Sequence, residues 1–359
     1  MATALAINME TEPLVPTRKD SFEAETKLFK DHAHSDNEAQ VYDVRRQVIA
    51  RSLVPCIVEG LKSEVKQSPP LLLWDDRGLS LFDAILESPQ YYPARREWAL
   101  LRKTIQDIAR NIPNRNRVVE LGAGNMKKTE LLLHTLQGQQ KRVEYLACDV
   151  DESALRRGIS ELRARFEGSS PYITIHGLLG TYEDCAAWLN LKSGGLPTSL
   201  IWLGNSMANF TPEQASKYVQ SFLSSGSSMI IALDGCQDQR EIAESYEGQC
   251  NREFILNGLS NANQILDDNV FAVNDWGFCG NWDPDLCMHE SFYVAQKDLT
   301  VNVCGETYRF KSGETMRSIK SGKWPRAKVL EICNNAGGRV KELWMDENQS
   351  YGVYVVEKV

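Results

Sequence analysis

The sequence predicts an α/β protein, in which a Rossmann-like, doubly wound parallel sheet is joined by a second, smaller α+β unit. Between residues 117 and 238, β-branched runs alternate five times with helical stretches, as in the βα repeats that build a parallel sheet. From Gln239 a long helical stretch is followed by short alternating runs, which are typical of antiparallel strands. Alternating strands return at 343–359, where we expect a hairpin that joins the main sheet.

The segment before the sheet is expected to be largely helical. Residues 1–35 are expected to form a mobile tail, and residues 36–66 place apolar side chains at a helical spacing that is broken at Pro55. The stretch 71–78 is interpreted as a short extended run and a turn. A helix is predicted within 79–89, and a second over 95–112 leads directly into the sheet.

The later elements follow the same two periodicities. Strands of the main sheet are predicted near 117–121, 143–150, 172–178, 199–203 and 228–233, with helices over 127–136, 151–166 and 212–223 between them. The second unit is predicted to contain helical residues 240–266 and strands at 292–294, 299–303 and 307–310. We therefore assign 97–238 and 324–359 to the sheet unit, and 36–96 and 239–323 to a substrate-binding unit.

Composition narrows the class of function. Forty Lys and Arg against 48 Asp and Glu give a net charge of −8, so a nucleic-acid-binding surface is not expected. The nine cysteines include no C-x-x-C pair, which predicts reduced thiols in a cytoplasmic protein and no metal site. No apolar stretch reaches the roughly 18–20 residues of a membrane helix, and no signal peptide is recognised. We expect a monomer that acts on a small molecule, without a nucleic-acid or membrane partner.

A glycine turn and an acidic residue define a candidate ligand site. Gly122 and Gly124 follow the first predicted strand of the sheet, and Asp149 ends the next strand. Such a turn lets the backbone approach an adenosine-containing ligand, and the acid can accept hydrogen bonds from ribose hydroxyls. A nicotinamide cofactor favours a third glycine, but Lys127 stands there. A donor without phosphates, such as S-adenosylmethionine, tolerates this departure. A tight turn without a ligand is the remaining alternative.

Several further motifs carry a resemblance to a known family. The runs YYPARRE, ELGAGNMKKTELLL, GTYED, LGNSMANF and GETMRSIKSGKW resemble those of amino-acid α-N-methyltransferases related to the histidine methyltransferase of ergothioneine biosynthesis. Fungal tryptophan and dimethylallyltryptophan N-methyltransferases are similar as well. The resemblance runs from about Val41 to Val359 and implies a class I methyltransferase sheet, S-adenosylmethionine as cofactor and a free-standing enzyme.

The resemblance implies a set of donor contacts. Gly122 and Lys128 would contact the methyl donor, Asp149 would bind its ribose, and Thr181 and Tyr182 would flank its adenine. Each assignment has a simpler alternative. Lys128 could be a solvated lysine on an amphipathic helix, and Tyr182 could be an ordinary core residue.

The resemblance also implies how the amino acid is held. Asn209, which closes the LG-x-x-x-x-N motif, would bond the substrate amino group, and Tyr91 and Tyr246 would contact its carboxylate and amine. Alternatively, Asn209 could cap the helix that begins near Pro212. Where histidine-specific relatives read Tyr-Asp-x-Arg-Gly, this chain has Trp74 in place of the tyrosine, so deprotonation by a phenol is in doubt at this position.

One departure from the family predicts the substrate. Ile319 stands where histidine-specific relatives have the glutamate that holds imidazole, Ser321 follows two residues later, and Ser291 aligns with a methionine. An apolar wall with extra room favours tryptophan, or a ring-substituted tryptophan, over imidazole. Two alternatives stay open. Ile319 could pack only in the core of an enzyme that methylates histidine to hercynine for ergothioneine, or the chain could be a non-catalytic protein that binds an adenosyl ligand.

Overall fold

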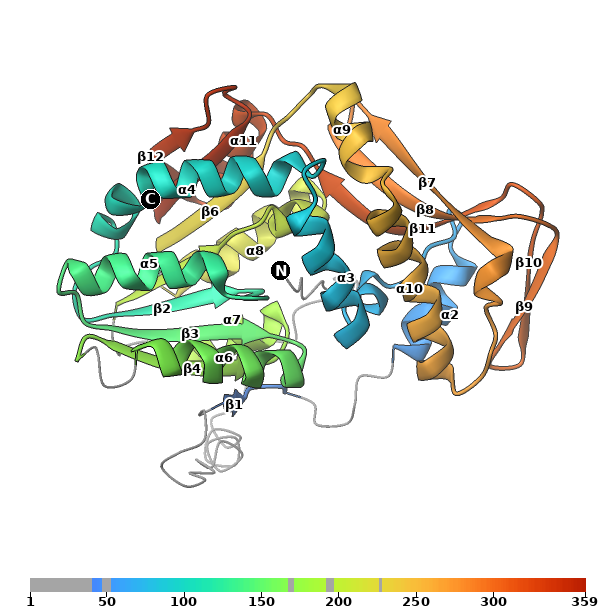
Figure 1. Ribbon diagram of the computed structural model, residues 1–359, viewed down its shortest axis with the longest axis horizontal. Helices are drawn as coiled ribbons and strands as arrows, with labels where there is room; N and C mark the ends of the chain where they lie inside the picture. The colour runs from blue at the N-terminus through green and yellow to red at the C-terminus, as the bar shows by residue number, and fades with distance from the viewer. Residues whose placement is uncertain (1–40, 47–52, 167–170, 192–196, 226–227) are drawn as a thin grey trace.

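The chain folds around one large mixed sheet, with a second group of helices and strands beside it (Figure 1). The computed structural model describes residues 41–46, 53–166, 171–191, 197–225 and 228–359. The tail expected at 1–35 lies outside these residues. Helices and strands alternate through the sheet unit, so the predicted α/β class with a Rossmann-like sheet is confirmed.

The large sheet has eight strands in the order β1-β4-β3-β2-β5-β6-β13-β12. The first six run parallel, whereas β13 is antiparallel to both of its neighbours, which confirms the predicted C-terminal hairpin. The strands are β1 Val41–Asp43, β2 Asn116–Leu121, β3 Val143–Asp149, β4 Ile173–Leu179, β5 Thr198–Trp202, β6 Ser228–Asp234, β12 Gly338–Met345 and β13 Tyr351–Lys358.

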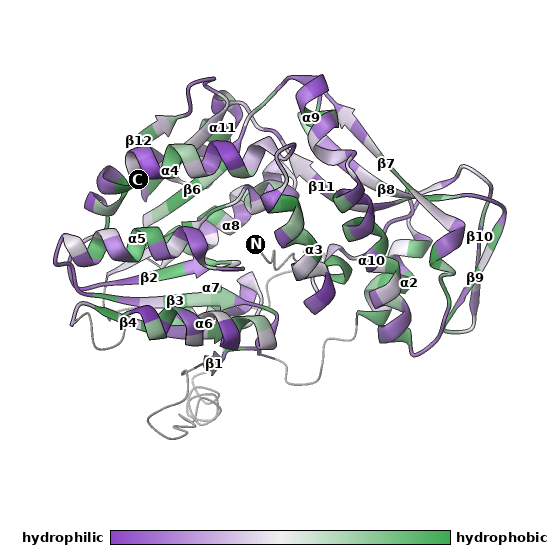
Figure 2. Cartoon of the chain, viewed as in Figure 1, coloured by the Kyte–Doolittle hydropathy of each residue, from purple (hydrophilic) through white to green (hydrophobic). Residues whose placement is uncertain are grey.

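Helices cover both faces of this sheet. Val118 packs with the helices on one face and its neighbour Val119 with those on the other, as the period of two in a strand requires. The first face carries α4 (Tyr92–Arg110), α5 (Lys127–Gly138) and α6 (Glu152–Phe166). The second carries α7 (Tyr182–Leu191), α8 (Pro212–Ser224) and α11 (Arg326–Asn335). The central strands are accordingly hydrophobic along most of their length (Figure 2).

The second group has its own hydrophobic core. It contains a three-stranded antiparallel sheet in the order β11-β8-β7 and a separate hairpin of β9 and β10. Its strands are β7 Trp276–Asp283, β8 Met288–Ala295, β9 Leu299–Val303, β10 Glu306–Phe310 and β11 Thr315–Gly322. Its helices are α2 (Val54–Lys62), η2 (Pro70–Leu73), α3 (Asp76–Glu87), α9 (Gln239–Tyr246), α10 (Gln249–Leu266) and η4 (Val273–Asp275).

Four local predictions were wrong or incomplete. Residues 41–43, predicted as helical, form the edge strand β1 beside β4. Pro55 lies in the first turn of α2 and therefore begins a helix rather than breaking one. The stretch 71–78 is not extended, because it holds the end of η2 and the start of α3, where the Asp75 carboxylate accepts a hydrogen bond from the Gly78 amide at 2.8 Å. Strands β7 and β11 were not predicted, and β8 is longer than the run predicted at 292–294.

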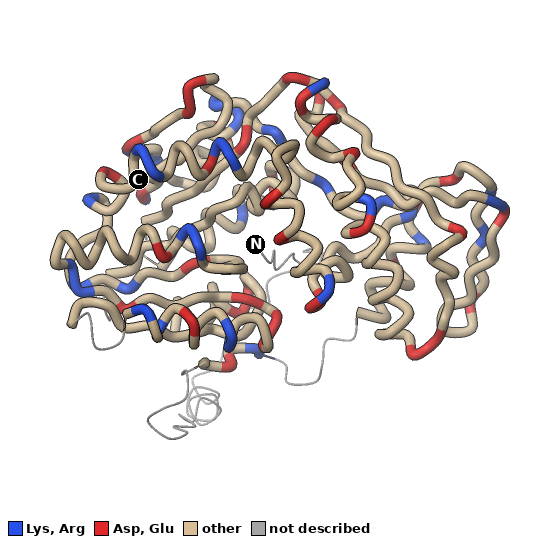
Figure 3. The backbone as a smooth tube through the Cα atoms, viewed as in Figure 1, with Lys and Arg blue, Asp and Glu red and all other residues tan. Residues whose placement is uncertain are grey.

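The predicted division into units remains a prediction. Helix α4 runs without interruption through the proposed boundary between residues 96 and 97, and Ile319 packs against the cores of both groups. Acidic and basic residues are interspersed along the outer helices and loops (Figure 3). Among the described residues, no helix is both long and apolar enough to span a membrane.

Candidate functional site

The glycine turn lies at the carboxyl end of β2. Gly122 has a φ of 67° and Gly124 a φ of 54°, values in the left-handed region that glycine adopts without steric cost. The Gly122 amide donates to the carbonyl of Cys148 at 2.9 Å. The turn is therefore tied to the end of β3, where Asp149 lies.

Asp149 presents a carboxylate to a cavity of about 280 Å³. Only 3% of the residue is exposed, and burial raises its pKa to about 6, although the amides of Gly124 and Val150 donate to its two oxygens at 3.2 and 2.7 Å and lower that pKa. Gly124 lines the same cavity. The arrangement leaves a carboxylate beside a backbone turn, as binding of a ribose hydroxyl requires.

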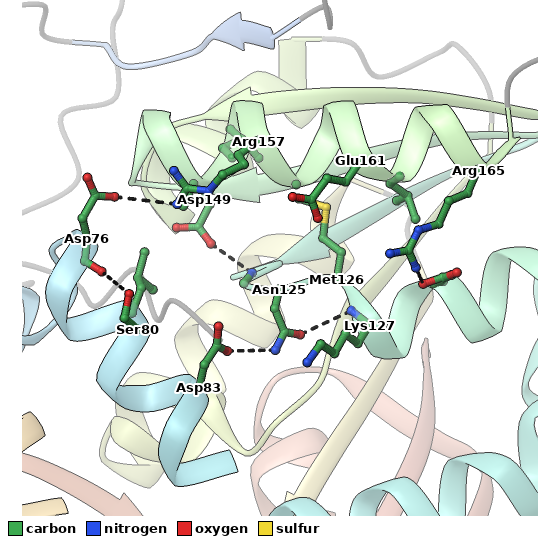
Figure 4. A pocket seen from close by; sticks show the side chains of 17 residues that line it. Asp76, Ser80, Asp83, Asn125, Met126, Lys127, Asp149, Arg157, Glu161 and Arg165 are labelled. Atoms are coloured by element: carbon green, nitrogen blue, oxygen red, sulfur yellow. Dashed lines mark hydrogen bonds and ion pairs between the residues drawn. The ribbon is translucent and has the colours of Figure 1, made fainter. Parts of the chain in front are cut away.

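Helix α3 forms the opposite wall of this cavity (Figure 4). Asp83 accepts a hydrogen bond from the Asn125 side chain at 2.9 Å, and Asp76 lies 3.9 Å from the Arg157 guanidinium. Asp76 also accepts from the Ser153 hydroxyl at 2.7 Å. These contacts join α3 to residues far along the chain, so no local sequence pattern predicts them.

The other predicted donor residues are not among those that line this cavity. Lys128 is buried and forms an ion pair with Glu97, whose second oxygen accepts from the Gly204 amide at 2.6 Å. The alternative interpretation of Lys128 as a solvated lysine on an amphipathic helix is therefore wrong. The Thr181 hydroxyl accepts from the Asp184 amide in the first turn of α7 at 3.3 Å and donates to the Asp184 carboxylate at 3.0 Å. Tyr182 is fully buried, with its ring 5.0 Å from that of Trp202. Donor contacts by Gly122, Lys128, Thr181 and Tyr182 remain predictions.

A second cavity, of about 60 Å³, brings together every residue predicted to bind the amino acid. These side chains come from the start of α4, the 3-10 helix η3 (Ser206–Asn209), the end of α9, and strands β8 and β11. They are Tyr91, Asn209, Tyr246, Ser291, Ile319 and Ser321. Ile319 pairs with Ser291 in the register of β11 and β8. The lining also includes Trp74, Phe82, Phe254, His289 and Lys320.

Aromatic rings form a continuous wall of this second cavity. The Trp74 ring centroid lies 5.1 Å from those of both Phe82 and Phe254, and the Tyr91 and Tyr246 rings are 5.7 Å apart. Tyr246 also stacks on His289 at 4.3 Å. Burial, with a smaller effect of Lys323, lowers the pKa of His289 to about 3. The wall is consequently aromatic and carries no charge on this histidine at neutral pH.

Asn209 is not the cap of the following helix. The N-cap of α8 is Thr211, whose hydroxyl accepts from the Gln214 amide at 3.3 Å in a reciprocal capping box. Asn209 lies one turn earlier, in η3, and is half-buried at the cavity. The capping alternative was therefore wrong.

Sequence reasoning missed a buried polar network below this cavity. The Lys323 ammonium is fully buried and donates to the hydroxyl oxygens of Tyr246 and Ser321 at 2.7 and 2.9 Å. It also lies 3.3 Å from Asp234, which accepts from the Tyr92 hydroxyl at 2.7 Å. The available signals were a lysine within GETMRSIKSGKW and an acidic residue that ends a buried strand.

Comparison with known proteins places the chain in a family. Residues 53–358 match the family described as histidine-specific methyltransferase, SAM-dependent. The chain is 56% identical to N-methyltransferase fsqC of Aspergillus fumigatus over 313 residues, 87% of this chain and 86% of that one. It is 28% identical to 4-dimethylallyltryptophan N-methyltransferase easF of the same species over 85% of this chain and 93% of that one. Identity to Ergothioneine biosynthesis protein 1 of Neurospora crassa is 30%, over 90% of this chain but 37% of that protein.

The sheet is that of a class I S-adenosylmethionine-dependent methyltransferase, with the last strand inserted antiparallel beside β6. Within that class, the chain belongs to the histidine-specific, SAM-dependent methyltransferase family. The predicted family, cofactor and N-methyl transfer are thereby confirmed. The turn at Gly122 and Gly124 and the Asp149 carboxylate on the cavity wall fit an adenosyl donor that has no phosphates.

Proposed function

We propose that this enzyme methylates the α-amino nitrogen of L-tryptophan or of a ring-substituted tryptophan. The observation that carries the proposal is the pairing of Ile319 with Ser291 across two strands that line the 60 Å³ cavity. An apolar side chain and a small one there make a wall suited to a large aromatic ring. The relative easF, whose name specifies 4-dimethylallyltryptophan, supports an indole substrate.

The charges around the cavity argue against imidazole. No acidic residue is among the described side chains that line it, and His289 is neutral at pH 7 because burial depresses its pKa to about 3. An imidazolium ring would enter without a counter-charge, and burying an unpaired charge is costly. An indole ring would instead meet the aromatic wall of Trp74, Phe82 and Phe254, where ring contacts add to the burial of apolar area.

The head group of the amino acid is assigned to the polar side of the same cavity, at Tyr91, Asn209 and Tyr246. S-adenosylmethionine supplies an electrophilic methyl group on a sulfonium. The side-chain oxygen of Asn209 can accept a hydrogen bond from the neutral amine and so hold its lone pair in one direction. Positioning of this kind can lower a barrier by roughly 7–11 kcal/mol, and a strong general base is not needed.

Helix α3 borders both cavities. Phe82 lines the smaller one, while Asp76 and Asp83 line the larger one. The smaller cavity is well below the roughly 300–1,000 Å³ of typical small-molecule sites. Entry of an aromatic amino acid therefore requires the side chains that line the smaller cavity to move apart.

A mass-spectrometric screen of the twenty amino acids with S-adenosylmethionine tests this function. We expect tryptophan to give the highest kcat/KM and its α-nitrogen to carry the new methyl group. A preference for histidine would replace the tryptophan assignment. Binding of S-adenosylmethionine in calorimetry without turnover of any amino acid or tryptophan derivative would instead support a non-catalytic binding protein.

We also propose that the enzyme is a cytoplasmic monomer that does not bind nucleic acid. The net charge of −8 and the free thiols of all nine cysteines support this proposal. Light scattering after gel filtration should give a molar mass near 40.5 kDa. A mass of twice that value would contradict the monomer.

A further inference from the structure

Lys323 is a buried cation directly beneath the substrate cavity. Its side chain has no exposed surface, and its backbone is fixed by a bond from its amide to the Cys287 carbonyl at 2.7 Å. The Gln237 side chain donates to its carbonyl at 2.7 Å as well. Tyr246 and Ser321, which the ammonium contacts, both line the cavity, whereas Asp234 does not. The ion pair thus presents its positive end toward the cavity.

Counting protons in this cluster fixes the direction of the hydrogen bonds that Lys323 makes. An ammonium has three donors and no acceptor, and the oxygens of Asp234, Tyr246 and Ser321 take all three. A serine hydroxyl has two acceptor lone pairs, and those of Ser321 receive Lys323 at 2.9 Å and the Asn205 side-chain amide at 3.4 Å. The Tyr246 oxygen lies 3.1 Å from that of Ser321, and either hydroxyl can donate to the other.

The ammonium also biases the role of Tyr246 toward the cavity. Because the Tyr246 oxygen accepts from Lys323 at 2.7 Å, one of its two lone pairs is taken by a buried cation. The Tyr91 hydroxyl is a further hydrogen-bond partner of Tyr246 at the cavity. A phenol whose oxygen accepts from an ammonium is polarised, and its own O–H becomes a stronger hydrogen-bond donor to an anion in the cavity.

We infer that Lys323 is a positioning residue that makes Tyr246 a donor to the α-carboxylate of the substrate. The inference rests on the proposed function, because it requires a substrate with a carboxylate beside the reacting amine. From the sequence alone, Tyr246 could bind either the carboxylate or the amine of the substrate. We assign the substrate carboxylate to Tyr246 and the substrate amine to Asn209.

The protonation state of Lys323 agrees with this role. Burial lowers its pKa, but Tyr246 and Asp234 outweigh burial, so the pKa of Lys323 lies above its ordinary value. The ammonium thus stays charged at neutral pH. Tyr246 would lie between the ammonium and a bound carboxylate and form a hydrogen bond with each. The positive charge adds an attraction for the carboxylate that a neutral side chain in the same place would not give.

The test compares ligands that carry only one half of the head group. In Lys323→Gln the amide can still bond Asp234 and Tyr246, but the charge is lost. Inhibition constants are measured for indole-3-propionate, which keeps the carboxylate, and for tryptamine, which keeps the amine, together with the KM for tryptophan. Lys328→Gln, an exposed lysine of α11, serves as the charge-matched control.

We expect Lys323→Gln to raise the inhibition constant of indole-3-propionate and the KM for tryptophan by about 10- to 100-fold. The inhibition constant of tryptamine should change about twofold or less. Donor affinity and the melting temperature monitor the fold. Equal losses for all three ligands, or an unchanged constant for indole-3-propionate, would overturn the inference, because a structural role of Lys323 does not distinguish carboxylate from amine.

Two further experiments cover a variant that does not fold and a substrate other than tryptophan. If Lys323→Gln does not fold, Asp234→Asn combined with Lys323→Met removes both charges without leaving one unpaired, and it should show the same carboxylate-selective loss. If the screen shows that another amino acid is the substrate, the corresponding deaminated acid and decarboxylated amine replace the indole ligands. The tryptophan assignment would then fail while the role of Lys323 stands or falls separately.

Discussion

The two cavities of this enzyme are built in different ways. The larger one takes its predicted residues, Gly124 and Asp149, from two adjacent strand ends, and their geometry depends on backbone conformation. The smaller one collects side chains from Trp74 to Ser321, and its character depends on which side chains they are. If the proposed assignments hold, the comparison teaches that donor binding depends on backbone geometry set by the fold, whereas substrate choice depends on one or two side chains.

Breaking the backbone turn should have the largest effect. Gly122→Val places a β-branched residue at a φ of 67°, which such residues avoid. We expect donor affinity to fall by more than about 100-fold, measured by calorimetry with S-adenosylhomocysteine. Gly138→Ala is the matched control, because an added Cβ there meets nothing within 4 Å. Retained donor affinity in a folded Gly122→Val protein would contradict the assignment.

Removal of the Asn209 side-chain amide, which is proposed to orient the substrate amine, should have the second-largest effect. We expect Asn209→Ala to lower kcat by about 100-fold while donor affinity changes little, because only the reacting group loses a partner. Thr211→Ala, two residues later, removes the cap of α8 and should cost about 1 kcal/mol of stability with turnover per folded molecule preserved. A kinetic result that makes the two variants alike would place Asn209 among the structural residues.

Exchange of the ring pocket should shift preference rather than abolish activity. Ile319→Glu with Ser291→Met should lower the tryptophan-to-histidine ratio of kcat/KM by about 10-fold or more, since a buried carboxylate disfavours indole and can pair with imidazolium. Ile319→Leu keeps the wall apolar and should leave the ratio nearly unchanged. Competition assays with both amino acids give the ratio directly, and an unaltered ratio in the double variant would remove Ile319 from the pocket.

The smallest expected effect is the pH dependence of donor binding. Asp149 has a pKa of about 6 because it is buried, so donor affinity should fall by up to about tenfold per pH unit below 6 as the carboxylate is protonated. The folded pKa exceeds the ordinary 3.8, so the contribution of this group to the free energy of unfolding decreases as pH rises from 3.8 through about 6. Asp149→Asn should bind the donor more weakly and without this pH dependence.

The difference between the cavities also explains what the sequence could predict. The five parallel strands and the closing hairpin follow from runs of apolar residues, whose burial on both faces leaves a clear signal. The edge strand at 41–43 was missed because only three residues pair with β4. Pro55 was misread because proline both breaks helices and begins them, and only the neighbouring structure distinguishes the two.

The candidate site was predictable where motifs fix the roles of single residues. Motif order named six of the side chains that line the smaller cavity, but it could not show that Lys128 pairs with Glu97 or that Lys323 contacts Tyr246. Both lysines are buried because an acid from a distant element reaches them. Such pairing depends on three-dimensional packing, and a lysine in a sequence is by default a solvated one.

The position of β13 in the large sheet has a consequence for the order of folding. This strand lies between β6 and β12, yet residues 235–350 separate it from β6 along the chain. The ribosome adds roughly 5–20 residues per second. While it synthesises the second group of helices and strands, one edge of β6 has no partner strand. Its exposed backbone groups are a template for pairing with other chains, so the interval before residues 351–358 arrive is when the nascent enzyme is most prone to aggregate.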